Sequence, residues 1–251
     1  MTRWLVLTAT VCPHADSGVA VADPERRRRQ YAAALAQWAR RFTAPSTRIV
    51  VAENSVGDPD RLQQLLDPNR HHPQVEYLCC GHRAATGAKG AAEAALLDDT
   101  IERLTRRAGG PAAQDLMVKI TGRLWVSNAA KVLPPVHHGR QVFVRRTLDG
   151  SYVDTRLLAA TVSVWRHELA GMADQVEEPT GVFLEHIVAA RLARGAATGA
   201  LSVAGFNRRP RFRGVSGTSG SRYGGLVERA RVAVGAPVEA LLRHLPPDKQ
   251  Y

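Results

Sequence analysis

The sequence predicts an α/β fold in which a mostly parallel β-sheet is flanked by helices. Short apolar runs, rich in β-branched residues, alternate with longer segments of helical periodicity. Such alternation is typical of parallel strands joined by right-handed crossovers. A length of 251 residues suits one large domain with a substantial buried core. We therefore expect a single domain that spans residues 1–251.

The first half of the chain predicts strands and helices in strict alternation. Residues 4–11 form an apolar strand, and the next helix begins where Asp23 can cap it and Pro24 can occupy its first turn. Arginines 26–29 could bind phosphate there, but they suit a solvated helix face better. The further expected elements are strand 48–52, helix 60–66, strand 75–79, a helix from about 90 to 107, a central strand from 115 and a short helix after Asn128.

The second half predicts a less regular pattern. Asp149-Gly150 is a hairpin signal between short strands at 141–145 and 151–154. Residues 155–170 and 179–194 are expected to form helices, the second closed by Gly195. Residues 201–205 suit a last strand, and 207–223 are so polar and glycine-rich that they predict a loop. A C-terminal helix is expected over 226–244.

The formal net charge of +11 indicates an acidic partner or surface, such as a nucleotide, a phospholipid face or a nucleic acid. Arginine is spread along the whole chain, so the few lysines, among them Lys89 and Lys119 close to glycines, are more informative. No window reaches the roughly 18 apolar residues of a membrane span, and no signal-peptide pattern begins the chain. Three cysteines give neither a disulfide framework nor metal-ligand spacing. These features predict a cytoplasmic protein, leave peripheral membrane contact open, and do not reveal an oligomeric state.

The stretch 115–128 is the strongest candidate for the chemistry. A strand-length apolar run breaks there into Lys119, Thr121 and Arg123 around one glycine. Open α/β sheets bind ligands beyond the carboxyl ends of their strands, so these groups suit a phosphate-bearing ligand. The alternative is a buried strand followed by an ordinary surface turn.

Other polar groups also follow expected strands or open helices. Lys89 precedes a helix, where backbone N–H groups and a cation can hold phosphate, although an ordinary helix-opening turn fits as well. Asp154 and Glu185 are candidate bases, with a helix cap and a solvated carboxylate as the alternatives. Two further groups complete the candidates. At a strand end lie Glu53, Asn54 and Ser55, which could bind a base or ribose or could cap a helix. The late loop carries Arg208, Arg211, Arg213 and Ser216, which could wrap a diphosphate or form a basic loop without a ligand.

Taken in order, these motifs resemble a family of small bacterial GT-A-type glycosyltransferases associated with surface-polysaccharide synthesis. The motifs are ENS (53–55), a glycine-lysine helix opening, KITGRLWVSN (119–128), VDTR (153–156), LEHIVAARL (184–192) and RGVSGTSG (213–220). The resemblance covers roughly residues 4–223. Two departures stand out: ordinary GT-A enzymes carry a metal-binding Asp-x-Asp where this chain has KITGR, and His186 replaces an Asp of the related helix motif.

The resemblance implies a GT-A-like domain with a nucleotide-binding part, 1–135, and an acceptor-side part, 136–251. The donor would be a nucleotide diphosphate-sugar and the acceptor a sugar or other hydroxyl compound, with no cofactor and no nucleic acid. The nucleotide would be bound by Thr8, Thr10, Glu53, Asn54, Ser55 and Lys89. The diphosphate would be bound by Lys119, Thr121, Arg123 and the late arginines with Ser216. Glu185 or Asp154 would deprotonate the acceptor. Cations in place of the Asp-x-Asp motif predict that no metal is needed.

Two rival classes remain open. A nucleotidyltransferase on a related fold would show a glycine-rich loop with Thr-Arg directly after the first strand, which residues 11–14 (VCPH) lack. A non-catalytic nucleic-acid-binding protein would interleave basic residues with exposed aromatics, whereas the aromatics here mostly occupy expected helix-face or strand positions.

Overall fold

The structure, a computed structural model, describes residues 1–13, 20–81, 89–136, 139–216 and 220–223. Within these ranges seven strands form one sheet, ordered β3-β2-β1-β4-β7-β6-β8. The strands from β3 to β4 are parallel, β7 is antiparallel to both β4 and β6, and β6 is parallel to β8. The strands are β1 (Arg3–Ala9), β2 (Thr47–Glu53), β3 (Val75–Cys79), β4 (Leu116–Thr121), β6 (Gln141–Phe143), β7 (Leu157–Thr161) and β8 (Ser202–Ala204).

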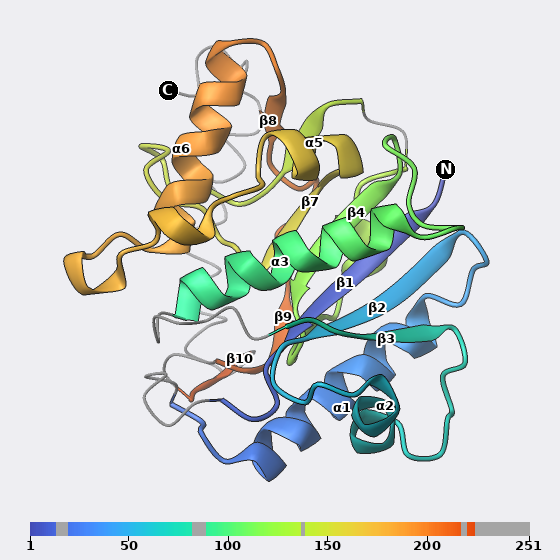
Figure 1. Ribbon diagram of the computed structural model, residues 1–251. Coiled ribbons are helices and arrows are strands. Elements are labelled where there is room, and N and C mark those ends of the chain that lie inside the picture. Colours follow the sequence, from blue (N-terminus) through green and yellow to red (C-terminus); the bar gives the residue numbers. More distant parts are fainter. Residues whose placement is uncertain (14–19, 82–88, 137–138, 217–219, 224–251) are drawn as a thin grey trace.

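Helices cover both faces of this sheet (Figure 1). Side chains alternate along β1, so Leu5 and Leu7 pack with α1 and α2, whereas Trp4 and Val6 pack in the core beneath α3, α5 and α6. The predicted cap of α1 is confirmed, since Asp23 accepts the N–H groups of Glu25 and Arg26. The helices are α1 (Pro24–Arg41), α2 (Pro59–Leu66), α3 (Lys89–Arg106), α4 (Ala129–Val132), α5 (Val162–His167), α6 (Leu184–Ala197) and the 3-10 turns η1 (Ala173–Gln175) and η2 (Glu178–Thr180).

The expected helix over 155–170 is wrong. Its first part is the strand β7 (Leu157–Thr161), and only α5 (Val162–His167) is helical. All five residues of β7 are buried between β4 and β6, and an apolar run on both faces of a sheet cannot be told from a buried helix by periodicity. The expected strand 151–154 is reduced to one bridge, between Arg146 and Val153.

The expected late loop is also partly wrong. Residues 212–215 and 222–223 form strands β9 (Phe212–Val215) and β10 (Arg222–Tyr223), which build a second small sheet with β5 (Leu124–Val126). Gly214 makes this pairing possible: its φ is 115°, and a Cβ there would collide with the carbonyl of Arg123. The expected C-terminal helix lies outside the described residues. Within the described ranges, no helix has the length and apolar character to traverse a bilayer.

Candidate functional site

The candidate site lies where the connections of the sheet change direction. The chain crosses through α1 from β1 to β2 on one side, and later through α3 to β4 on the other side of β1. The carboxyl ends of β1 and β4 therefore flank a topological switch point, where open α/β sheets usually bind ligands. β7 runs antiparallel to β4, so the residues before β7 reach the same edge, and Thr121 N donates to the carbonyl of Arg156 at 3.0 Å. Figure 1 shows the start of α3 and the β9–β10 pair on this side of the molecule.

Glu53, Asn54 and Ser55 tie the ends of β1 and β2 together. The carboxylate of Glu53 is fully buried and accepts the backbone N–H groups of Val11 (2.9 Å) and Ser55 (2.7 Å), that of residue 56, and the Ser55 hydroxyl. Asn54 Oδ1 accepts the hydroxyl of Thr10 at 2.8 Å. The geometry therefore gives Glu53 the task of shaping the loop, in place of the expected contact with a nucleoside, and leaves Asn54 and Ser55 half-buried beside it.

Lys119 is buried in an ion pair that the sequence did not predict. Glu93, on α3, places Oε1 2.7 Å from Lys119 Nζ and accepts the hydroxyl of Thr8 at 3.0 Å. Only 2% of the Lys119 side chain is exposed. Burial alone would raise the pKa of Glu93, but the charge and hydrogen bond of Lys119 hold that pKa below its usual value. Glu93 thus already offsets the charge that Lys119 was expected to offer a diphosphate, and contact between Lys119 and a diphosphate stays a prediction.

This buried pair connects to one of the two candidate bases. Lys119 Nζ also donates to the carbonyl oxygen of Thr155, whose hydroxyl donates to Glu185 Oε1 at 2.8 Å. Glu185 lies in the first turn of α6 and is half-buried, and this is its single hydrogen bond among the described residues. A carboxylate oriented by one donor retains lone pairs for a substrate proton, as a general base requires.

Asp154, the other candidate base, is fully engaged. Arg156 donates to it through Nε (2.7 Å) and Nη2 (2.6 Å), and Arg145 donates at 3.2 Å. Burial opposes its ionisation, yet Arg156 and Arg145 hold the pKa of Asp154 below its usual value. Arg156 is itself fixed over the rings of Phe212 (4.4 Å) and Tyr223 (5.0 Å). A carboxylate paired in this way is a poor proton acceptor, which favours Glu185 over Asp154 as the base.

Arg123 is a buried cation for which the described residues provide few partners. It is 4% exposed, and its Nε and Nη1 atoms form no hydrogen bond within the described part of the chain. The neighbouring Arg27, 3% exposed, donates to the carbonyls of Thr10 and Val21 and to the Tyr31 hydroxyl. Burial and the charge of Arg123 lower the pKa of Arg27. Arg27, expected on a solvated face, therefore belongs to a pair of buried like charges at the switch point.

The glycine between Thr121 and Arg123 fixes this arrangement. Gly122 N donates to the carbonyl of Thr8 at 2.9 Å, and a Cβ at Gly122 would meet that same carbonyl at 2.6 Å. The chain must therefore turn out of β4 pressed against the end of β1. Thr121 stays half-buried at the strand end.

The late arginine segment is only partly near Arg123. In the register of β5 and β9, Gly214 pairs with Leu124 and Arg213 with Trp125, which brings Arg213 and the buried Ser216 to the Arg123 side. Arg211 lies beside Ser127 and Asn128 at the far end of β5, and Arg208 precedes it, both exposed. The strand register therefore places Arg211 away from Arg123, and the expectation that Arg208 and Arg211 meet the diphosphate stays a prediction.

The start of α3 already holds an anion of the protein itself. Glu178, from η2, accepts Gly90 N at 2.6 Å and Lys89 N at 3.3 Å. A carboxylate at a helix N-terminus occupies the place expected for phosphate. Lys89 is exposed at this end of the helix, and residues 86–88 of the motif lie outside the described residues.

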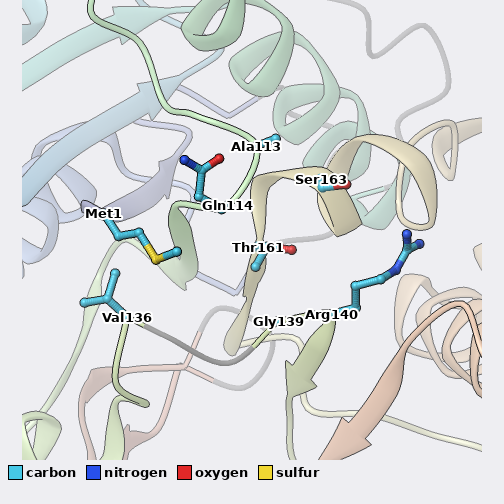
Figure 2. A pocket seen from close by; sticks show the side chains of 8 residues that line it. All are labelled: Met1, Ala113, Gln114, Val136, Gly139, Arg140, Thr161 and Ser163. Atoms are coloured by element: carbon cyan, nitrogen blue, oxygen red, sulfur yellow. The ribbon is translucent and has the colours of Figure 1, made fainter.

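A cavity of ≈ 460 Å³ lies at the opposite edge of the sheet (Figure 2). It is lined by Met1, which precedes β1, by Gln114 and Val136, and by Thr161 at the end of β7. This cavity contains none of the expected site residues. No three His, Cys, Asp or Glu side chains of the described ranges converge in a way that could hold a metal ion.

Comparison with known proteins gives similarity of structure alone. No family model matches the sequence, and no curated protein matches it. The chain is similar to galactosyltransferase LgtC in complex with donor and acceptor sugar analogues (12% identity, 80% of this chain and 73% of that one, TM-score 0.45). It is also similar to a protein assigned as a nucleotide-diphospho-sugar transferase from Desulfovibrio desulfuricans (9%, 82% and 80%, 0.45). A protein assigned as a glucose-1-phosphate thymidylyltransferase from Bacillus anthracis, in complex with sucrose, matches at 12% identity (100% and 98%, 0.42).

Proposed function

We propose that the protein is a glycosyltransferase that moves a sugar from a nucleotide diphosphate-sugar to a hydroxyl acceptor. The observation that carries this proposal is Arg123, a buried guanidinium at the switch point of the sheet, two of whose nitrogens have no partner among the residues that the structure describes. A buried cation without a partner is costly, and an anion in contact with it would remove that cost. Arginine guanidinium groups bind phosphate oxygens with bidentate hydrogen bonds, so the diphosphate of a nucleotide-sugar suits this position.

In the proposed reaction, the acceptor oxygen forms a bond to the anomeric carbon of the donor sugar. The bond from that carbon to the phosphate oxygen breaks, and its electron pair leaves on the nucleoside diphosphate. Glu185 takes the proton of the acceptor hydroxyl, and Thr155 holds its carboxylate in place. Arg123 stabilises the charge that develops on the leaving diphosphate, with Arg27 beside it.

The remaining nucleotide contacts would come from the tips of β1 and β2. Thr10, Asn54 and Ser55 are joined there at half-buried positions, while Glu53 fixes the loop from beneath. The resemblance of the sequence further suggests a saccharide acceptor of bacterial surface-polysaccharide synthesis. We also propose that no divalent metal is required, because Arg123 and Arg27 would supply the positive charge that a metal otherwise offers a diphosphate.

Calorimetry with matched pairs of nucleoside diphosphates and monophosphates tests the proposal. We expect one nucleoside diphosphate to bind with a millimolar Kd or tighter. Its affinity should be roughly tenfold higher than that of the matching monophosphate, a difference of about 1.4 kcal/mol in binding free energy. Equal affinity for both would contradict a diphosphate site at Arg123. Release of pyrophosphate from a nucleoside triphosphate and a sugar phosphate, without sugar transfer, would instead support the nucleotidyltransferase.

A further inference from the structure

Three aromatic side chains form a cluster beside Glu185. Tyr152 and Phe183 each pack against His186, with ring centroids 5.3 Å and 5.7 Å from the imidazole. Phe183 directly precedes α6 and His186 lies in its first turn, next to Glu185. Tyr152 comes from the turn 147–152, where its backbone is held by three hydrogen bonds with Thr147. We refer to Tyr152, Phe183 and His186 as the ring cluster.

The ring cluster is open to solvent. Among the residues that the structure describes, four large hydrophobic side chains are exposed, and two of them are Tyr152 (38% exposed) and Phe183 (41%). Isolated exposed hydrophobic residues are common in proteins, but adjacent exposed rings rimmed by polar groups are typical of a binding surface. Hydrogen bonds hold the main chain of Tyr152, and Phe183 is the N-cap residue of α6.

Polar groups at the edge of the cluster can donate hydrogen bonds. Nδ1 of His186 accepts the N–H of Phe183 at 3.2 Å, so the neutral imidazole carries its proton on Nε2. Burial first, and then the charges of the Glu185 and Asp154 carboxylates, raise the pKa of Tyr152 to about 12. The hydroxyl therefore stays protonated at neutral pH and can act as a donor close to Glu185.

We infer that the ring cluster binds the sugar ring of the acceptor, an uncharged pyranose, and presents one of its hydroxyl groups to Glu185. A pyranose has an apolar face of C–H groups, which suits an aromatic ring, and a rim of hydroxyls, which suits the donors of His186 and Tyr152. An anionic ligand would be repelled by Glu185. The inference deepens the proposed function and rests on Glu185 acting as the base.

The test uses the full-length protein with a saturating nucleoside diphosphate, and saturation-transfer NMR with methyl glycosides of glucose, galactose and N-acetylglucosamine. We expect the native protein to bind at least one of them, with glucuronic acid binding more weakly. Tyr152→Ala and Phe183→Ala should each weaken that binding about tenfold, while Tyr152→Phe, which keeps the ring, should retain most of it. Leu148→Ala removes a side chain that is 60% exposed in the same turn as Tyr152 but outside the ring cluster, and it should have no effect.

Two results would overturn the inference. One is a native protein that binds nucleoside diphosphate but none of the three glycosides. The other is glycoside binding that Tyr152→Ala and Phe183→Ala both leave unchanged in folded protein, as judged by their urea-unfolding curves. A native protein that fails to bind any nucleoside diphosphate contradicts the proposed function instead, so the two failures are distinguishable.

Discussion

Glu93 Oε1 lies 2.7 Å from Nζ of Lys119, and this buried pair joins helix α3 to the central strand β4. The pair is not isolated, because Glu93 also accepts the hydroxyl of Thr8 and Lys119 also donates to the carbonyl of Thr155. It therefore connects the end of β1 with the segment that orients Glu185. A buried ion pair adds little net stability, but loss of one member leaves a charge without compensation.

The first prediction concerns this pair. Glu93→Gln should lower the free energy of unfolding by about 3–5 kcal/mol, because Lys119 remains buried without a counter-charge. Urea unfolding measures the change. Glu102→Gln, whose partner Arg106 is 77% exposed, is the matched control on the same helix and should cost less than about 1 kcal/mol. If the double variant Glu93→Gln/Lys119→Met were no more stable than Glu93→Gln alone, the unpaired charge would not be the cause.

Glu93 also shows where prediction from the sequence stopped. Glu93 lies on the apolar face of α3, beside the buried Gly90, Ala94 and Leu97. A carboxylate on such a face indicates a buried partner. Lys119 occupies a strand interior, which carries the same signal. Each residue is visible in the sequence as out of place, but the pairing of α3 with β4 is a tertiary relationship that spacing does not reveal.

The strands and helices of the first half were predictable because caps, prolines and apolar runs agree with each other there. Asp23-Pro24 marks a helix start and the run before Cys12 marks a strand, and both hold. The second half was less predictable, because strand β7 is buried on both faces and strands β9 and β10 exist only through pairing with β5. The position of Arg211 depended on that unpredicted register.

The second prediction concerns acid stability. The folded pKa of Asp154 lies below its unfolded value of about 3.9, because Arg156 and Arg145 stabilise the carboxylate. The folded protein thus binds fewer protons than the unfolded chain, so this stabilisation is complete above about pH 4 and is lost as pH falls through the folded pKa. Asp154→Asn should be less stable than the parent at pH 7, and the difference in unfolding free energy should shrink at pH 3. An equal difference at both pH values would contradict the ion-pair explanation.

The third prediction concerns the proposed base. Glu185→Gln should lower kcat by roughly 10²–10⁴ while the Kd for nucleoside diphosphate stays the same, because the amide accepts the Thr155 hydroxyl but cannot take a proton. Steady-state kinetics and calorimetry separate the two quantities. A fully active Glu185→Gln protein would remove Glu185 from the mechanism.

The fourth prediction concerns metal dependence. Transfer activity should survive exhaustive dialysis against EDTA, because Arg123 and Arg27 supply positive charge at the strand ends and the nearby Glu93 is already neutralised by Lys119. Activity that disappears on chelation and returns with magnesium or manganese would refute this. Calorimetry of the nucleoside diphosphate with and without magnesium provides a second measurement that does not depend on turnover.

The last prediction separates binding from stability at Arg123. Two nitrogens of the buried Arg123 guanidinium lack a partner in the described part of the chain, which destabilises the unliganded fold. Arg123→Met keeps much of the length and removes the charge, so it should raise the free energy of unfolding by about 1–3 kcal/mol. The same change should weaken binding of nucleoside diphosphate at least tenfold, because the proposed ligand for that charge is the diphosphate. Arg208→Gln, at an exposed position away from the switch point, is the control and should alter neither quantity. Opposite signs for stability and affinity are the result that a purely structural arginine cannot produce, because its removal would cost stability. If Arg123→Met lowers the unfolding free energy and leaves the Kd unchanged, Arg123 has a role in the fold and the diphosphate must bind elsewhere.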